Sequence, residues 1–312
     1  MENSQLLRSN QTKTKRSSRV SLNVRHVPWM FAIPAIVLTI LVRFVPSVMG
    51  IGYAFTDWNG IGWSAHPVGL ANFIKIFSLD EITRTGVIHT LLICVLMVAF
   101  SNIIGLLLAI VLQQRFKFRS LYRALFFLPF AMSYLATGYI WKYILTFEGP
   151  FNQFLGMIGL QNLQRPWLAD PNTALYMVVI VMVWQYIGLT LVIYLAGLEG
   201  IPEELHDATA VDGATKWMKF KRVTLPLLTP AITVATLLTM VWGLAIFDQI
   251  ISLTGGGPVN STETLATLVY KNSFIYGNFG YGSALAVVLA ILVTCFALLQ
   301  NALARKKEEA LS

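Results

Sequence analysis

Residues 87–112 read VIHTLLICVLMVAFSNIIGLLLAIVL and contain no Asp, Glu, Lys or Arg. A helix needs about 20 predominantly apolar residues to cross the hydrocarbon core of a bilayer, and this run is longer than that. In lipid, only helices and closed barrels satisfy their own backbone hydrogen bonds, and a barrel would show short alternating segments instead of a continuous run. The stretch therefore predicts a membrane-spanning α-helix.

The rest of the chain repeats this pattern. It is 56% hydrophobic and only 12% charged, whereas about 25% of the residues in a soluble domain are charged. A first apolar run at about residues 29–55 is too long for the core of a cleaved signal peptide, so we expect it to be retained. We predict an all-α polytopic membrane protein with about six transmembrane helices, a basic arm at residues 1–28, a membrane domain at 29–303 and a tail at 304–312. The four remaining runs lie at about residues 121–145, 174–198, 227–253 and 284–303.

Lys and Arg are distributed unequally among the segments between the runs. Seventeen of the 23 lie in the arm, in the tail and in the segments that follow the second and fourth runs, whereas five lie in the other loops. Because cytoplasmic segments are enriched in these residues, both termini are predicted to be cytoplasmic, which requires an even number of spans. The opposite loops contain two short apolar patches, residues 72–77 and 151–160. Interfacial helices and packed loop residues remain alternatives for both patches.

The cytoplasmic loop after the fourth run is the most informative polar segment. Residues 198–230 read LEGIPEELHDATAVDGATKWMKFKRVTLPLLTP. The Pro-Glu-Glu sequence at 202–204 is typical of a helix start, and Gly213 favours a turn because glycine enters left-handed conformations at low cost. We predict a short helix, a turn and a second, basic helix that returns to the membrane, a surface suited to docking another protein. An ordinary solvated loop is the alternative.

This loop resembles the EAA loop of ABC-importer permeases, in which an E-A-A triplet is followed after three residues by glycine and nine residues later by I-x-L-P. Asp207-Ala208-Thr209 stands at the triplet, Gly213 at the glycine and Val223-Thr224-Leu225-Pro226 at the last element, with Thr209 as the main departure. The resemblance implies a coupling helix that sits in a cleft of a separate ATPase subunit and moves the spans between inward- and outward-facing states. The residues that it assigns to this coupling are Glu203, Glu204, Asp207, Ala208, Thr209, Asp212, Gly213, Leu225 and Pro226.

Other loop segments resemble the carbohydrate-uptake subfamily of these permeases, of the maltose, multiple-sugar or glycerol-phosphate type. The segments are Thr56-Asp57-Trp58, Gly69-Leu70-Ala71-Asn72-Phe73, Trp167-Leu168-Ala169-Asp170-Pro171, Leu253-Thr254-Gly255-Gly256-Gly257-Pro258 and Thr262-Glu263-Thr264. The resemblance implies the cytoplasmic (inner) membrane of a bacterium or archaeon as the location. It also implies a carbohydrate substrate, a second permease subunit in a heterodimer, two cytoplasmic ABC ATPase subunits and an extracytoplasmic sugar-binding protein.

Several chemistries are not predicted. No G-x-x-x-x-G-K-[ST] phosphate loop occurs, and Gly255-Gly256-Gly257 is predicted to be a tight turn. The four histidines and two cysteines show no metal-ligand spacing, so we expect no metal site. The net charge of +8 resides in loops between spans, so we expect no nucleic-acid partner. We also expect no enzyme activity and no cofactor. The alternative function is an ATP-independent channel or secondary transporter. Such a protein would carry ionisable residues inside its spans, where only Arg43 is a clear candidate.

A sugar path needs hydrogen-bonding groups for hydroxyls and aromatic rings for C–H faces, and a pocket needs only a few of these. The second, fourth and fifth runs contain such residues at membrane depth. For each of them, helix packing or an interfacial aromatic belt is the alternative. The candidates are Asn102, Trp184, Gln185, Tyr186, Trp242, Gly243, Phe247 and Gln249.

Overall fold

The computed structural model describes residues 32–62, 64–78, 81–114, 116–202, 204–205, 209 and 213–309, with side chains as far as residue 306. The predicted basic arm, residues 1–28, lies outside the described residues. The chain divides into two compact units, residues 1–48 and 49–312, and each is described by itself.

In the first unit, α1 (Ile33–Thr39) continues into a π-helical segment, η3 (Ile40–Phe44), and then into α2 (Val45–Tyr53), whose last residues belong to the second unit. The 21 residues Ile33–Tyr53 are long and apolar enough to cross a membrane. This confirms the first predicted span within narrower limits than 29–55. Arg43 lies in η3.

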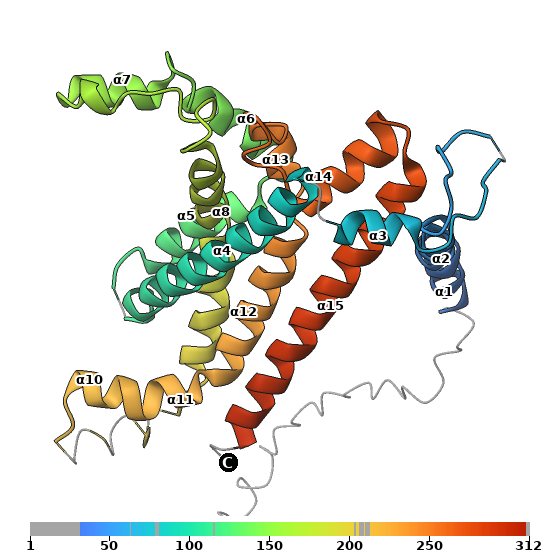
Figure 1. Cartoon of the computed structure of the whole chain (residues 1–312). Coiled ribbons are helices and arrows are strands. Elements are labelled where there is room, and N and C mark those ends of the chain that lie inside the picture. The colour runs from blue at the N-terminus through green and yellow to red at the C-terminus, as the bar shows by residue number, and fades with distance from the viewer. Residues whose placement is uncertain are drawn as a thin grey trace, which may run out of the picture. The chain divides into compact units, whose positions relative to one another are not determined.

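The second unit contains the remaining described elements, and Figure 1 labels the α-helices among them. In chain order they are α3 (Ala71–Phe77), α4 (Glu81–Gln113), α5 (Arg119–Ala131), α6 (Tyr134–Ile144), α7 (Pro150–Met157), η4 (Gln161–Leu163), α8 (Ala174–Glu199), α10 (Lys216–Lys219), η5 (Phe220–Thr224), α11 (Leu225–Leu227), α12 (Thr229–Leu244), α13 (Asp248–Leu253), α14 (Leu265–Tyr270), η6 (Lys271–Ile275) and α15 (Phe279–Glu309).

The described residues are helical, and they form no β-strand beyond one isolated bridge between Thr56 and Pro67. Four helical segments are long and apolar enough to cross a membrane, and two bent pairs bring this number to six if each pair is one span. The all-α polytopic fold with about six spans is therefore confirmed. The last helix, α15, is longer than the predicted 284–303 and continues into the predicted tail.

Two predicted spans are not straight helices, which corrects the sequence-based picture. The third, 121–145, is α5 and α6 with a bend of 97° between them, and the fifth, 227–253, follows a bend of 67° before α12 and is interrupted before α13. Pro129 lies in the last turn of α5, and Met132 then adopts extended backbone dihedrals. Pro230 lies in the first turn of α12, just after the second bend, where a helix tolerates the missing N–H of proline. Apolar composition predicted the spans but not these breaks.

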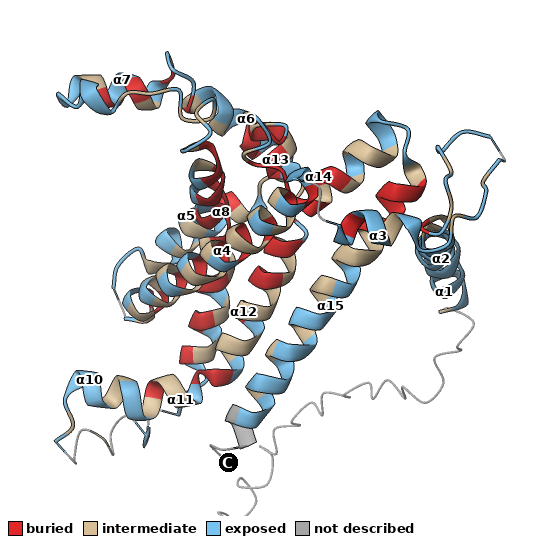
Figure 2. Ribbon diagram, in the orientation of Figure 1, coloured by how far each residue is buried: buried red, intermediate tan, exposed pale blue. Residues whose placement is uncertain are grey.

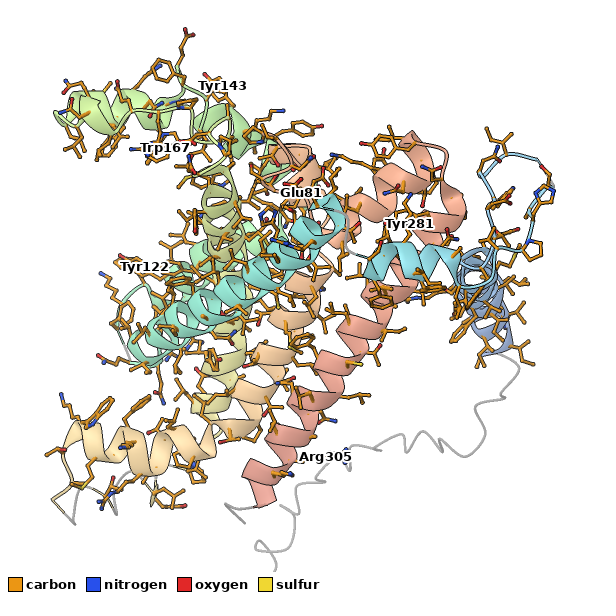
Figure 3. All side chains as sticks on the ribbon, in the orientation of Figure 1. Glu81, Tyr122, Tyr143, Trp167, Tyr281 and Arg305 are labelled. Atoms are coloured by element: carbon orange, nitrogen blue, oxygen red, sulfur yellow. The ribbon has the colours of Figure 1, made fainter. Side chains whose placement is uncertain are left out.

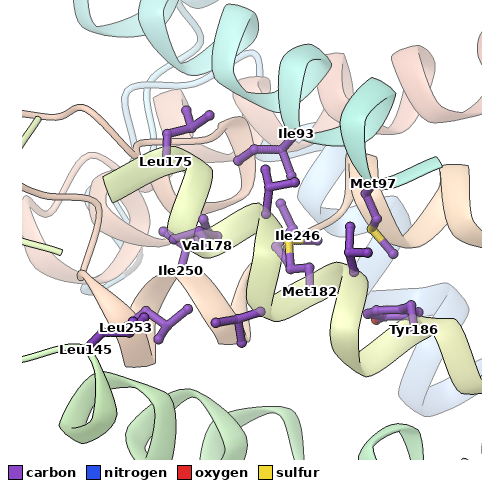
Figure 4. Packing of buried hydrophobic residues seen from close by; sticks show 13 residues of the cluster. Ile93, Met97, Leu145, Leu175, Val178, Met182, Tyr186, Ile246, Ile250 and Leu253 are labelled. Atoms are coloured by element: carbon purple, nitrogen blue, oxygen red, sulfur yellow. The ribbon is translucent and has the colours of Figure 1, made fainter. Parts of the chain in front are cut away.

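Helix α8 forms the centre of the second unit, where α4, α5 and α12 pack against it. Two thirds (67%) of its most apolar stretch is buried, as the red segments of Figure 2 show. Figure 4 shows Val178, Met182 and Tyr186 at successive turns of α8, facing Ile93 and Met97 of α4. At Gly188, an added Cβ would meet the Phe126 carbonyl oxygen and lie 2.7 Å from the Phe127 Cα. Small residues permit such close approach of helices in membranes, so α5 and α8 are in backbone contact there.

The two apolar patches, residues 72–77 and 151–160, lie wholly or largely in helices, α3 and α7. Asn72 of α3 donates from Nδ2 to the carbonyl oxygens of Ala54 and Thr56, each at 2.9 Å. In the second loop, the Trp167 indole N–H donates to Asn152 Oδ1 of α7 at 2.8 Å (Figure 3). Asn72 and Trp167, which belong to the loop motifs of the sequence, thus form the hydrogen bonds that hold α3 and α7 against their loops.

Candidate substrate path and coupling loop

Gln185 of α8 contacts the backbone at the break between α5 and α6. Its side chain is fully buried, and Nε2 donates to the Met132 carbonyl oxygen at 3.3 Å and to Thr137 Oγ1 at 3.4 Å. Its Oε1 accepts from Gln249 Nε2 of α13 at 3.5 Å. These distances are long compared with the usual 2.9–3.0 Å, so the bonds are weak. The amides of Gln185 and Gln249 therefore connect the bent α5–α6 span, the central helix α8 and helix α13.

Four aromatic rings gather beside these amides. Tyr186 of α8 contacts Phe130, Tyr134 and Trp242, with centroid separations of 5.8, 5.7 and 5.3 Å. Phe130 and Trp242 are also 5.7 Å apart. The Tyr134 and Tyr186 rings are nearly parallel at 12°. We call Phe130, Tyr134, Tyr186 and Trp242 the aromatic cluster; it combines ring faces with the amide groups of Gln185 and Gln249.

The other predicted path residues lie elsewhere. Asn102 donates from Nδ2 to Thr239 Oγ1 at 3.0 Å and accepts from the Tyr194 hydroxyl at 2.6 Å, so its amide joins α4, α12 and α8. This is the helix-packing alternative that the sequence left open. Gly243 packs against Cys94 and Met97 of α4, where an added Cβ would lie 3.1 Å from the Cys94 Cα.

Trp184 and Phe247 face two different hollows. Trp184 packs edge-on against Trp141 at 5.3 Å and lines an apolar groove of about 600 Å³ between α4 and α8. Phe247 contacts Tyr270 at 5.2 Å and lines a second hollow of about 500 Å³ among α12, α14, η6 and α15. The structure therefore brings together Gln185, Tyr186, Trp242 and Gln249.

Sequence reasoning missed Phe130, Tyr134, Thr137 and the Met132 carbonyl. They belong to the site only because the third span is bent between α5 and α6. Pro129 followed by Ser133 was the available indication, because proline inside an apolar run and a serine at a helix start together suggest a break.

An ion pair joins the turn-rich segment between α13 and α14 to Lys271, the first residue of η6. Lys271 Nζ contacts Glu263 Oε1, and Thr267 Oγ1 donates to Glu263 Oε2 at 2.6 Å. Gly255 and Gly256 have φ of 65° and 92°, which confirms the predicted tight turn, and Gly256 touches the ion pair with no room for a Cβ. No group of three His, Cys, Asp or Glu side chains that could hold a metal occurs among the described residues.

The coupling loop is described in part. Glu204, Leu205 and Thr209 are helical, whereas Glu203, Asp207, Ala208 and Asp212 lie outside the described residues. Leu225 and Pro226 form α11, immediately before the bend into α12.

Gly213 has a φ of 66°, the left-handed conformation predicted for the turn. The Ala214 N–H donates to the Thr209 carbonyl oxygen at 3.1 Å, a bond across six residues that is typical of the Schellman ending of a helix. Thr215 Oγ1 then accepts from the Met218 N–H at 3.3 Å, which caps α10. The helix, turn and second helix predicted for this loop are therefore present in the residues described.

The second helix carries an aromatic pair that is partly exposed. The Trp217 and Phe220 rings are stacked at 5.8 Å; Trp217 is 71% exposed and Phe220 is half-buried. Lys216, Lys219 and Lys221 are their neighbours in sequence. Large exposed apolar groups mark interaction sites for proteins or membranes.

Comparison with known proteins defines the class to which this geometry belongs. Residues 101–309 match the family described as binding-protein-dependent transport system inner membrane component. A probable ABC transporter permease protein of Pyrococcus horikoshii is 37% identical over 84% of this chain and 90% of its own length. The multiple sugar-binding transport system permease protein of Streptococcus mutans is 32% identical over 90% and 96%.

Among solved structures, a bacterial ABC transporter that imports alginate contains a chain of similar fold. Its TM-score is 0.77 with 22% sequence identity, over 89% of this chain and 94% of that one. The chain belongs to the family of inner membrane components of binding-protein-dependent transport systems. It is thus a multi-pass membrane component of a transporter.

Proposed function

We propose that this chain is the permease subunit of an ATP-driven ABC importer that moves a sugar or sugar derivative across the cytoplasmic membrane by alternating access. The relatives support the substrate class, since one is a multiple sugar-binding permease and another is the trehalose/maltose permease of Thermococcus litoralis. The observation that carries the proposal is the pairing of the Gln185 and Gln249 amides at the interruptions of two spans, where the Gln249 side chain also hydrogen-bonds Tyr186 of the aromatic cluster.

This site suits a sugar for a physical reason. The hydrogen bonds of Gln185 are long, so sugar hydroxyls can replace them at little cost when the helices separate. The aromatic cluster supplies faces for the C–H side of a sugar ring. Interrupted helices in membranes are tolerated where they line a cavity or are buried in protein, and the α5–α6 break fits that rule.

The coupling loop supplies the second part of the proposal. Its Gly213 turn and partly exposed Trp217–Phe220 stack support docking onto a separate ATPase. The partners are a second permease subunit, two ATPase subunits and an extracytoplasmic sugar-binding protein, and the chain itself performs no catalysis. Both termini and the coupling loop are cytoplasmic in this proposal, as the distribution of Lys and Arg indicates.

The test uses the assembled transporter in proteoliposomes, with labelled maltose, trehalose and maltotriose as probes. Gln185→Ala and Trp242→Ala should each lower the uptake of the transported probe by about fivefold or more, since about 1 kcal/mol of lost hydrogen bonding or stacking corresponds to that factor. Subunit assembly, measured by size-exclusion chromatography, should remain normal.

Trp184→Ala is the matched control, because Trp184 is adjacent to Gln185 in sequence but faces the groove between α4 and α8. Its uptake should stay close to that of the unmodified protein. Normal uptake in both path variants would assign the sugar site to the partner subunit. Sugar uptake by this chain alone without ATP would favour the channel or secondary transporter, and ATP hydrolysis by the isolated chain would contradict the permease assignment.

A further inference from the structure

A polar junction joins three helices at the start of the coupling loop. Arg123 of α5 donates from Nη2 to Glu199 Oε1 at 2.7 Å, and Glu199 is the last residue of α8. The same Nη2 lies 3.4 Å from the Leu112 carbonyl oxygen, near the end of α4. Gln113, the last residue of α4, donates from Nε2 to the Leu198 carbonyl oxygen at 3.4 Å. The ends of α4 and α8 therefore meet the side chain of Arg123.

Helix electrostatics explains why an arginine is needed here. The C-terminal end of a helix has negative partial charge, which favours cations and disfavours carboxylates. Glu199 is a carboxylate at such an end, and Arg123 is the cation that offsets it. A guanidinium can contact a carboxylate and a carbonyl oxygen together because its donors are arranged in a fixed plane.

Helix α5 contacts α8 a second time, one turn further along α5 and three turns away along α8. Gly188 of α8 is in backbone contact with Phe126 and Phe127 of α5. Two contacts that lie three turns apart on α8 restrain both the sliding and the rotation of α5 relative to α8. Because α5 also carries Phe130 and leads to Met132, a rigid α5–α8 pair keeps these groups in register with Tyr186 and Gln185.

We infer that Arg123 is a positioning residue that makes α5 move together with α8 when the coupling loop moves. This inference rests on the proposed function, because it requires that the loop after Glu199 receives the motion of an ATPase. Movement at the loop then carries one side of the aromatic cluster, Phe130 and Tyr186, as a unit relative to Trp242 of α12. Without the ion pair, α8 moves but α5 lags, and ATP is hydrolysed without full rearrangement of the sugar site.

The test measures sugar uptake and ATP hydrolysis together in proteoliposomes that contain the complete transporter, with the transported probe sugar. Arg123→Gln and Glu199→Gln should each lower uptake about five- to tenfold, within the usual range of coupling between sites. ATP hydrolysis should continue, so the ATP consumed per sugar should rise by a similar factor. The double variant Arg123→Glu/Glu199→Arg should recover most of the uptake that each single variant loses.

Lys117→Gln is the matched control, since it removes a cation from the same cytoplasmic turn but Lys117 is exposed and contacts only the Phe118 ring among the described residues. An unchanged ratio of ATP to sugar in both single variants overturns the inference, and so does a charge-swapped protein no better than the single variants. The proposed function fails separately, if the unmodified complex shows no ATP-dependent sugar uptake.

Discussion

Two ion pairs join segments of the second unit, and they differ in their surroundings. Glu263 and Lys271 are 1% and 18% exposed, and they join the turn-rich segment before α14 to the start of η6. Arg123 and Glu199 are 26% and 48% exposed, and they join two long helices. A buried ion pair is costly to break because one charge then remains buried without a partner, whereas an exposed pair contributes little to stability. We expect the first pair to maintain the fold and the second to affect transport.

The largest effect on stability is expected at the buried pair. Glu263→Leu leaves Lys271 without its counter-charge and removes the acceptor of Thr267, and should cost about 3–5 kcal/mol. The measurement is thermal unfolding of the purified protein in detergent. Glu263→Leu/Lys271→Met should regain much of the lost stability, because neither charge then remains buried. An unchanged Tm in the single variant would contradict a structural role for this pair.

The largest effect on transport without loss of folding is expected at Gly213. Its φ of 66° disfavours a β-branched residue, and backbone strain of about 1–3 kcal/mol should displace the helix that precedes Gly213 in the coupling loop. Gly213→Val should therefore abolish uptake while the protein still inserts in the membrane, with weaker ATPase binding or sugar-independent ATP hydrolysis.

Gly213→Asn provides the control, because asparagine tolerates left-handed backbone better than other residues with side chains. It should retain most of the uptake and ATPase binding. If Gly213→Val transports and binds ATPase normally in the same membrane preparation, the solvated-loop alternative holds for this segment.

The smallest effect is expected at a third, still more exposed pair in the loop between α2 and α3. Asp57 Oδ2 lies 3.3 Å from His66 Nδ1, with side chains 48% and 76% exposed. The His66 backbone N–H, which donates to Asp57 Oδ1 at 2.8 Å, holds the pKa of the Asp57 carboxyl below its usual value. A carboxyl with a lowered pKa stabilises the loop above its unfolded pKa, and this contribution is lost only as the pH falls through the folded pKa.

Asp57→Asn should consequently leave uptake within about twofold of the unmodified protein, as expected for an exposed pair. Between pH 5 and 8 the variant and the unmodified protein should show parallel pH profiles, since Asp57 stays ionised throughout. Diverging profiles in that range would show that this pair has a role that its exposure does not indicate.

The sequence predicted what depends on composition and local chemistry. Long apolar runs predicted the spans, because a bilayer imposes a minimum length on a helix. Gly213 and Gly255–Gly256 predicted left-handed turns, because few other residues adopt them at low cost. These features are determined by residues close together in the chain.

The composition of the aromatic cluster could not be predicted in the same way. Trp184, Gln185 and Tyr186 are consecutive, yet Trp184 faces a different surface from the other two, and helical periodicity does not say which neighbour each face meets. Phe130 and Tyr134 join the site through a bend of 97° whose direction depends on tertiary packing. The pairing of Arg123 with Glu199 likewise needs two helices that are 76 residues apart at this point.

The separation of Trp184 from Gln185 has a consequence for how such proteins diversify. In the proposed function, mutations on the Gln185 side of α8 alter which cargo is recognised, while mutations on the Trp184 side alter contacts with whatever adjoins the groove. Gln185 contacts Thr137 and Gln249, whereas Trp184 contacts Trp141. Because the contacts differ, substitutions on one side of the helix should have effects largely independent of those on the other. Two relatives of this chain could therefore share an outer surface and differ in cargo after only a few substitutions along one stripe of a single helix.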